Sequence, residues 1–253
     1  LPICFIMLLN ILLSFSIFGD FTDIDLSNEK QNSKYKNLAN EFVQNAMIVG
    51  VGKEVIIQFN PQKNAVPMQK TVLRPSIFSS NGEWLINFAS NRIDINWNAK
   101  NDSSRIDSEE FIEKAYLFLD IIERSYEITY NRIAFNSEDI YYNFDEEKAK
   151  SIFKKTSNTN LSLYKDKDLK QWVLQLAISE RPQDFTTDVN IVTSIQRTIK
   201  NLPWIKNIDS ISVHYDCNTI FDEKNKITKM EAKSFLNNYV KWRDKFNKEI
   251  FEN

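Results

Sequence analysis

Glycine is scarce in this chain, which contains only Gly19, Gly50, Gly52 and Gly82. The phosphate-cradling loops G-x-G-x-x-G and G-x-x-x-x-G-K-[ST] cannot be written with glycines at these positions. Their absence argues against a dinucleotide-binding dehydrogenase, a P-loop NTPase and a typical kinase. We therefore expect no nucleotide cofactor, and no other feature of the sequence predicts one.

Histidine and cysteine are also scarce, with one histidine, His214, and two cysteines, Cys4 and Cys217. These numbers exclude a site with several histidine ligands, and they provide neither a disulfide framework nor zinc-ligand spacing. In the segment SVHYDCN, strand alternation places His214 and Asp216 on one face and Cys217 on the other. A metal pair at His214 and Asp216 is the alternative to an ordinary strand histidine, which we favour, and we predict no catalytic residue.

Neither sign of charge dominates, because 32 Lys and Arg stand against 34 Asp and Glu, for a formal net charge of −2. Such a chain has no general attraction for nucleic-acid backbones or anionic membranes. In the last helix, cations are interspersed with acids, which is typical of a solvated face. These cations are Lys229, Lys233, Lys241, Arg243, Lys245 and Lys248. We expect nucleic acid not to be a partner.

An uncharged apolar run lies near the start of the sequence, from residue 3 to residue 19. It is slightly shorter than the ~20 residues that a membrane-spanning helix needs, and it also suits the apolar part of a signal peptide. Its polar interruptions at Asn10, Ser14 and Ser16, with many β-branched and aromatic residues, favour a buried strand or strand pair. A core element and a targeting segment are the two alternatives, and we favour the core element.

Hydrophobic periodicity predicts strands and hairpins that alternate with helices. The strand segments are 47–59, 69–78, 84–97, 127–135, 161–180, 188–202 and 210–218, and the helices are 27–46, 107–126 and a last helix from about residue 228. Gly50 and Gly52 indicate a bend or bulge, and Pro75 indicates a bent or edge-placed strand. In the hairpin at 79–97, apolar residues alternate with polar or smaller ones, so we expect a scaffold whose tryptophans pack under helices.

This order of elements argues for an α+β fold of antiparallel sheets packed by long helices. The second part of the chain looks like a looser echo of the first, which suggests two similar sheet-plus-helix halves. We place these halves at residues 1–156 and 157–253, with one continuous domain as the alternative.

Two arginines stand out as candidate binding residues. Arg92 and Arg132 each lie at or near a strand end among polar residues, where a guanidinium can pair with a carboxylate or bind an anion or a partner. A structural salt bridge is the other interpretation, and we favour it, because an isolated arginine needs further convergent groups to make a site.

Four stretches of the sequence carry a family resemblance: the hairpin SSNGEWLINFASNRIDINW, the strand ITYNRIAF, the closing helix WRDKFNKEIFEN and the opening LPIC. Together they resemble a sporadically distributed family of uncharacterised bacterial α+β proteins. In the closing helix, Asp244, Asn247, Phe251 and Glu252 fit the family pattern. The resemblance implies a cytoplasmic bacterial protein with a defence-related or mobile gene neighbourhood, and it supplies no catalytic residue.

We therefore expect a non-enzymatic component that binds a protein partner, such as a part of a bacterial defence or toxin–antitoxin system. One alternative is a secreted or membrane-tethered protein that uses residues 3–19 as signal or anchor. The other is a metal-dependent hydrolase or nuclease, which requires carboxylates from distant segments to converge in a cleft.

Overall fold

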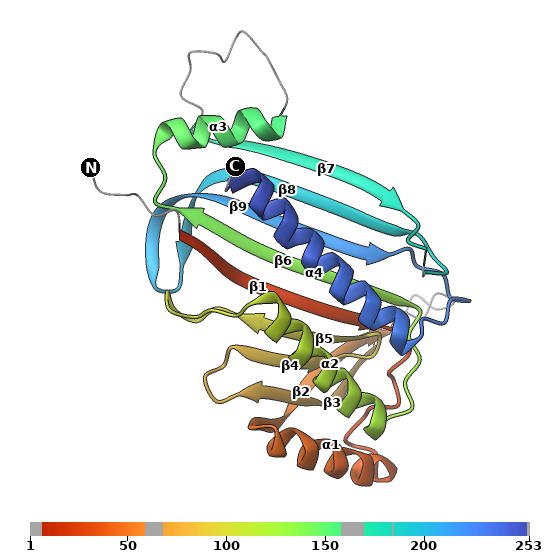
Figure 1. Cartoon of the computed structure of the whole chain (residues 1–253). Coiled ribbons are helices and arrows are strands. Elements are labelled where there is room, and N and C mark those ends of the chain that lie inside the picture. The colour runs from red at the N-terminus through yellow and green to blue at the C-terminus, as the bar shows by residue number, and fades with distance from the viewer. Residues whose placement is uncertain (1–6, 59–67, 158–169, 184, 252–253) are drawn as a thin grey trace.

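The computed structural model describes residues 7–58, 68–157, 170–183 and 185–251, in which nine strands form one antiparallel sheet (Figure 1). The strands are β1 Met7–Phe18, β2 Met47–Gln58, β3 Met68–Ser79, β4 Trp84–Phe88, β5 Arg92–Asn98, β6 Arg132–Tyr142, β7 Trp172–Glu180, β8 Val189–Leu202 and β9 Ile205–Thr219. The helices are α1 Asn32–Gln44, α2 Ser108–Ser125, α3 Glu146–Ser157 and α4 Lys229–Phe251, with a short 3-10 turn at Glu29–Gln31.

The apolar run near the start of the chain forms a central strand of the sheet. The strand order is β2-β3-β4-β5-β1-β6-β9-β8-β7, so β1 pairs with β5 on one side and with β6 on the other. Leu13, Phe15 and Ile17 on β1 are almost completely buried. The prediction of a core element is confirmed for residues 7–18. No described helix is long and apolar enough to cross a membrane.

The helices pack on one face of the sheet, where α2 and α4 lie across its middle (Figure 1). Asp107 caps α2 by accepting a hydrogen bond from the backbone N–H of Glu110. Trp84 of β4 stacks on Phe111 of α2 and meets Phe118 edge to face. The helix-facing side of the hairpin at 79–97 is therefore scaffold, with Trp84 packed under α2 as predicted.

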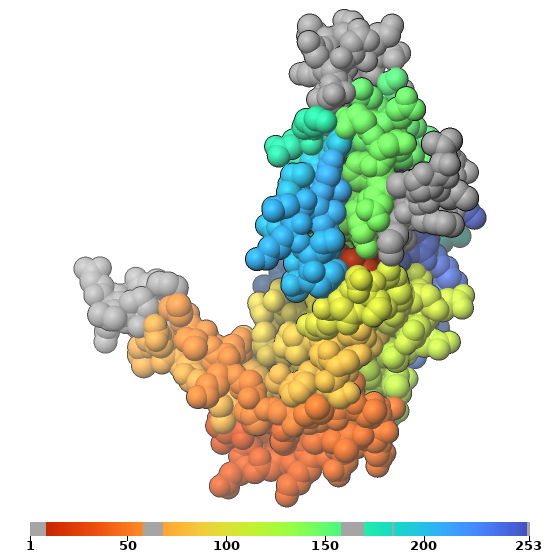
Figure 2. Space-filling view, turned by 90° about the vertical axis from the view of Figure 1, so that its left-hand side faces the viewer, coloured from red at the N-terminus to blue at the C-terminus, as the bar shows by residue number. Residues whose placement is uncertain are grey.

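The opposite face of the sheet carries no helix of the described chain. The hairpin β2–β3 projects from the body on this side, away from α2 and α4, so the surface is hollowed next to it (Figure 2). The described helices therefore leave this face of the sheet uncovered (Figure 1).

The α+β class and the antiparallel strands are as predicted. The prediction of several sheets is wrong for the described chain, because its strands form a single sheet. The prediction of a bulge at Gly50 and Gly52 is wrong, because β2 and β3 pair in one register from Met47 to Gln58. Pro75 lies just beyond the β3–β4 ladder, which covers only Ser76–Phe78, so it costs that ladder no hydrogen bond. The first strand of the hairpin expected at 161–180 lies outside the described residues, and the division into two domains stays a prediction.

Helix α3 was not predicted from the sequence. Its apolar positions are few, and Ala149 and Ile152 are its two buried residues. They pack against Tyr141 and Phe251, which belong to β6 and to the end of α4. A helix with such a narrow apolar face depends on tertiary contacts, and periodicity alone gives little sign of it.

Candidate functional site

The candidate site is the uncovered face of the sheet, here called the open face. Its members alternate along the central strands with the buried residues that face the helices. They are Ser14, Ser16, Asp94, Asn96, Asn136, Glu138, Ser194, His214, Asp216 and Asn218. Most of these are small side chains that both donate and accept hydrogen bonds.

The register of the strands brings these polar residues side by side. Ser14 lies between Asn96 on β5 and Asn136 on β6, and Asn136 lies opposite Asp216 on β9. In the next row Ser16 donates a hydrogen bond of 2.6 Å to Asp94. Ser14 and Ser16 are themselves buried, although they lie on the open face. The floor of the open face is thus recessed and polar.

Arg92 and Arg132, the two arginines singled out in the sequence, meet at one end of this face. Both lie directly opposite Phe18 of β1, one from β5 and one from β6. Two strand spacings separate their backbones by about 10 Å. The Arg132 guanidinium lies over the Phe18 ring at 4.9 Å, while Arg92 forms an ion pair of 2.9 Å with Asp94 and keeps a half-exposed side chain. The tertiary structure therefore makes one arginine–phenylalanine–arginine row from three distant segments.

The other end of the open face holds a small charged cluster. Glu138 forms an ion pair with Lys200 of β8 and lies 3.7 Å from the Nε2 atom of His214. Partial burial lowers the pKa of His214 from its ordinary value. A cavity of about 240 Å³ opens beside this cluster and is lined by Asn136, Glu138, Ser194, His214 and Asp216, among others.

His214 and Asp216 lie on one face of β9, as alternation predicts, and line the same cavity. The metal alternative needs further ligands, however. Among the described residues no group of three or more His, Cys, Asp or Glu side chains is placed to hold a metal ion. The pair is therefore part of the polar wall of the open face.

On the opposite side of the sheet a polar network is buried under α4. Tyr215 donates a hydrogen bond of 2.8 Å to Asn247, which donates one of 2.7 Å to the fully buried carboxyl of Asp139. Burial raises the pKa of Asp139. Arg243 lies 3.7 Å from Asp139 and is only 3% exposed, so its assignment to a solvated face of the last helix is wrong. It is buried because α4 turns this position onto the sheet.

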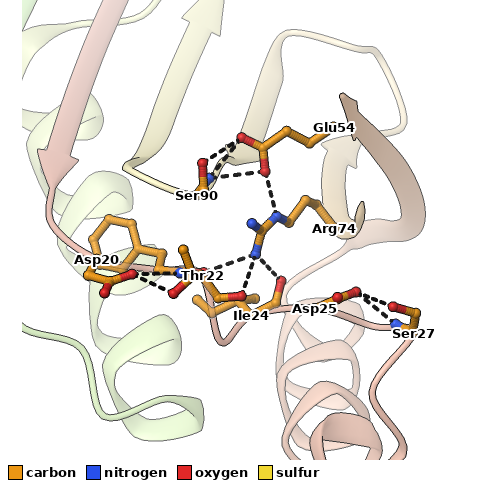
Figure 3. Close-up of polar contacts among 9 residues, drawn as sticks. Asp20, Thr22, Ile24, Asp25, Ser27, Glu54, Arg74 and Ser90 are labelled. Carbon is orange, nitrogen blue, oxygen red and sulfur yellow. Dashed lines mark hydrogen bonds and ion pairs between the residues drawn. The ribbon is translucent and has the colours of Figure 1, made fainter. Parts of the chain in front are cut away.

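A second buried arginine, Arg74 of β3, holds the chain between β1 and α1 in place (Figure 3). It donates to main-chain carbonyls of the 21–24 loop and to Glu54 of β2, at 2.8 Å. Glu54 in turn accepts hydrogen bonds from the backbone N–H and the hydroxyl of Ser90. These contacts join β2 and β3 to the 21–24 loop and to the turn between β4 and β5. Arg74 and Glu54 therefore have a structural role.

Cys217 is fully buried on the helix side of the sheet. Burial raises the pKa of its thiol to about 12, so the thiolate that a nucleophile needs is not formed at neutral pH. Cys217 is therefore a buried free thiol, whereas Cys4 lies outside the described residues.

Sequence reasoning did not single out the asparagines and serines of the open face. Their signal is present in the strands, because many of the positions between the buried residues are serine or asparagine. Only the strand order shows that Ser14, Asn96 and Asn136 belong to one surface.

No protein-family model, no curated protein and no solved structure matches this chain.

Proposed function

We propose that the chain is a non-enzymatic component that binds a protein partner in the open face of its sheet. The observation that carries the proposal is that one entire face has no helix over it among the described residues and presents recessed serine and asparagine side chains. Such groups match the donors and acceptors of a polypeptide backbone. The arginine–phenylalanine–arginine row supplies a place for an acidic side chain of the partner.

The place of this component in a bacterial defence or toxin–antitoxin system, and in the cytoplasm, rests on the family resemblance of the sequence. The alternative as a secreted or membrane-tethered protein stays a prediction. The alternative as a metal-dependent hydrolase or nuclease also stays a prediction, and among the described residues no group of three or more His, Cys, Asp or Glu side chains is placed to hold a metal ion.

We also propose that the two parts of the chain are related in structure. The strand order supports this, since it runs outward from the centre as β1-β5-β4-β3-β2 on one side and as β6-β9-β8-β7 on the other. This similarity relates the segment from β1 to α2 to the segment from β6 to α4, and a helix of each, α2 or α4, lies across the same face (Figure 1). Because β6 lies before residue 157, the similarity does not follow the predicted boundary between residues 1–156 and 157–253.

The experiment is affinity purification of the tagged full-length protein, followed by measurement of the dissociation constant with the purified partner. The variant Arg92→Ala/Arg132→Ala removes the charged groups of the row. The matched control, Lys241→Ala/Lys245→Ala, removes the same charge from exposed positions of α4 on the other side of the sheet. Hydrogen bonds to charged groups contribute about 1.5–3 kcal/mol each, so we expect the arginine variant to weaken binding at least ~10-fold.

A photo-crosslinking residue at position 96, in the open face, should capture the partner, whereas one at position 241 should not. Equal affinity of the arginine variant and the control, or capture from position 241 alone, would place the partner elsewhere. Recovery of the protein with no stoichiometric partner contradicts the proposed function itself.

A further inference from the structure

Strand β7 is an edge strand of the described sheet. It is the last strand in the order and pairs with β8 only, so its outer backbone N–H and C=O groups meet no described strand. Aliphatic side chains are exposed on both faces: Val173 is 64% exposed, Leu176 50% and Ile178 51%. An edge with free backbone groups and flanking aliphatic side chains is a template for a further strand.

Monomeric proteins protect such edges with lysine, proline or bulges. Between Lys170 and Glu180 β7 has no charged residue and no proline, and its ladder with β8 runs from Trp172 to Glu180 in one register. The opposite edge strand, β2, carries Lys53 and Glu54 in its middle. The unprotected edge of the described sheet is therefore β7.

We propose that β7 pairs antiparallel with β7 of a second copy of this chain, about a two-fold axis at Leu176. In this register Leu176 lies opposite its own copy, and Leu174 lies opposite Ile178 of the other strand. These three residues share the face on which Trp172 packs against the helix-side core. The aliphatic row is thus complementary to itself, as a two-fold interface requires.

Charge at the two ends of the strand agrees with this pairing. Glu180 lies opposite Trp172 of the second copy, and Lys170 of that copy comes two residues before this tryptophan, just outside the strand. Lys170 is 70% exposed, and it forms an ion pair of 3.5 Å with Glu146. Each end of the pair then brings a carboxylate beside an ammonium group, which parallel pairing of the same strands does not do. The sheets of the two copies become one continuous sheet, with the open face of each left free.

The test uses the two-fold axis. Leu176→Lys places two ammonium groups face to face, and Leu176→Glu places two carboxylates face to face. Each variant alone should be monomeric by sedimentation at about 50 µM, where the unchanged protein is a dimer. An equimolar mixture of the two variants should recover the dimer mass, because lysine then faces glutamate. Val55→Lys, at a similarly exposed position of the other edge strand, should leave the dimer intact.

A crosslink gives a second measurement that does not depend on how a charged residue affects folding. Leu176→Cys in a Cys4→Ser background should form a disulfide between copies on mild oxidation, since a two-fold axis brings the same position together. A monomeric unchanged protein, a dimer that survives both charge variants, or a mixture that stays monomeric would each overturn the proposal. Binding of β7 by a strand of another protein in place of a second copy would overturn it as well.

Discussion

At the scale of single residues, two buried arginines, Arg74 and Arg197, join separate elements of the fold by hydrogen bonds. Arg197 of β8 is 4% exposed and donates two hydrogen bonds of 2.8 and 2.9 Å to Glu146 at the start of α3. It also donates to Asp209 of β9 at 2.7 Å. The bond from Arg197 lowers the pKa of Glu146 to about 2. This pair therefore anchors α3 to the sheet.

The variant Glu146→Gln tests this anchor. The carboxylate has a lower pKa when folded than when unfolded, so its stabilisation is present above about pH 4.5 and is lost as the pH falls toward 2. We expect Glu146→Gln to lower the free energy of unfolding by about 1–2 kcal/mol at pH 7, a value reduced by solvent screening. Urea unfolding should show this difference shrinking between pH 4.5 and pH 2.

The neighbouring variant Glu147→Gln removes an equal charge at an exposed position and should be neutral at every pH. A loss that stays constant down to pH 2, or that Glu147→Gln reproduces, would show that the Glu146 carboxylate does not anchor α3.

At the scale of elements, helix ends follow local sequence rules even where packing decides the rest. Thr228 and Glu231 form a reciprocal cap at the start of α4: the threonine N–H donates to the glutamate carboxylate at 2.8 Å, and the glutamate N–H donates to the threonine hydroxyl at 3.1 Å. The sequence T-x-x-E encodes this cap. It fixes the start of the helix that covers the centre of the sheet.

Thr228→Ala removes the hydroxyl that accepts from Glu231. Loss of an N-cap side chain costs about 1 kcal/mol, and we expect the free energy of unfolding to fall by this amount. Thr129→Ala is the matched control, because Thr129 is exposed and lies outside the helices. Thermal unfolding of both variants followed by circular dichroism gives the comparison; equal midpoints would contradict a role for the cap in α4.

At the scale of the whole molecule, the junction between β1 and β6 holds the sheet together. The two strands come from distant parts of the chain and pair from Met7–Tyr142 to Phe18–Arg132, with one irregularity at Asn10/Leu12. At the end of this ladder the chain passes very close to itself. A Cβ atom built on Gly19 would lie 2.3 Å from the carbonyl oxygen of Thr129.

Gly19→Ala should therefore be strongly destabilising, because a backbone oxygen must move at the junction; we expect a loss of about 1–3 kcal/mol. Gly50→Ala is the matched control, since the nearest atom to its added Cβ is 3.7 Å away. Free energies of unfolding in urea check both. A Gly19→Ala protein as stable as Gly50→Ala would mean that the β1–β6 junction tolerates separation.

The sequence by itself determined the α+β class, most strands, the start of α2 and the core role of residues 7–18. These features depend on local periodicity and on capping, which neighbouring residues encode. The exclusion of phosphate loops and of a multi-histidine site likewise follows from composition alone.

Tertiary structure alone decided the strand order and with it the candidate site. The row of Arg92, Phe18 and Arg132 exists because β1 inserts between β5 and β6. Arg243 is buried, although its charged neighbours in the sequence indicate a surface. Pairing over long sequence separations depends on packing of the whole sheet, and no local pattern specifies it. For the same reason only the strand order shows that β7 is an edge strand of the described sheet.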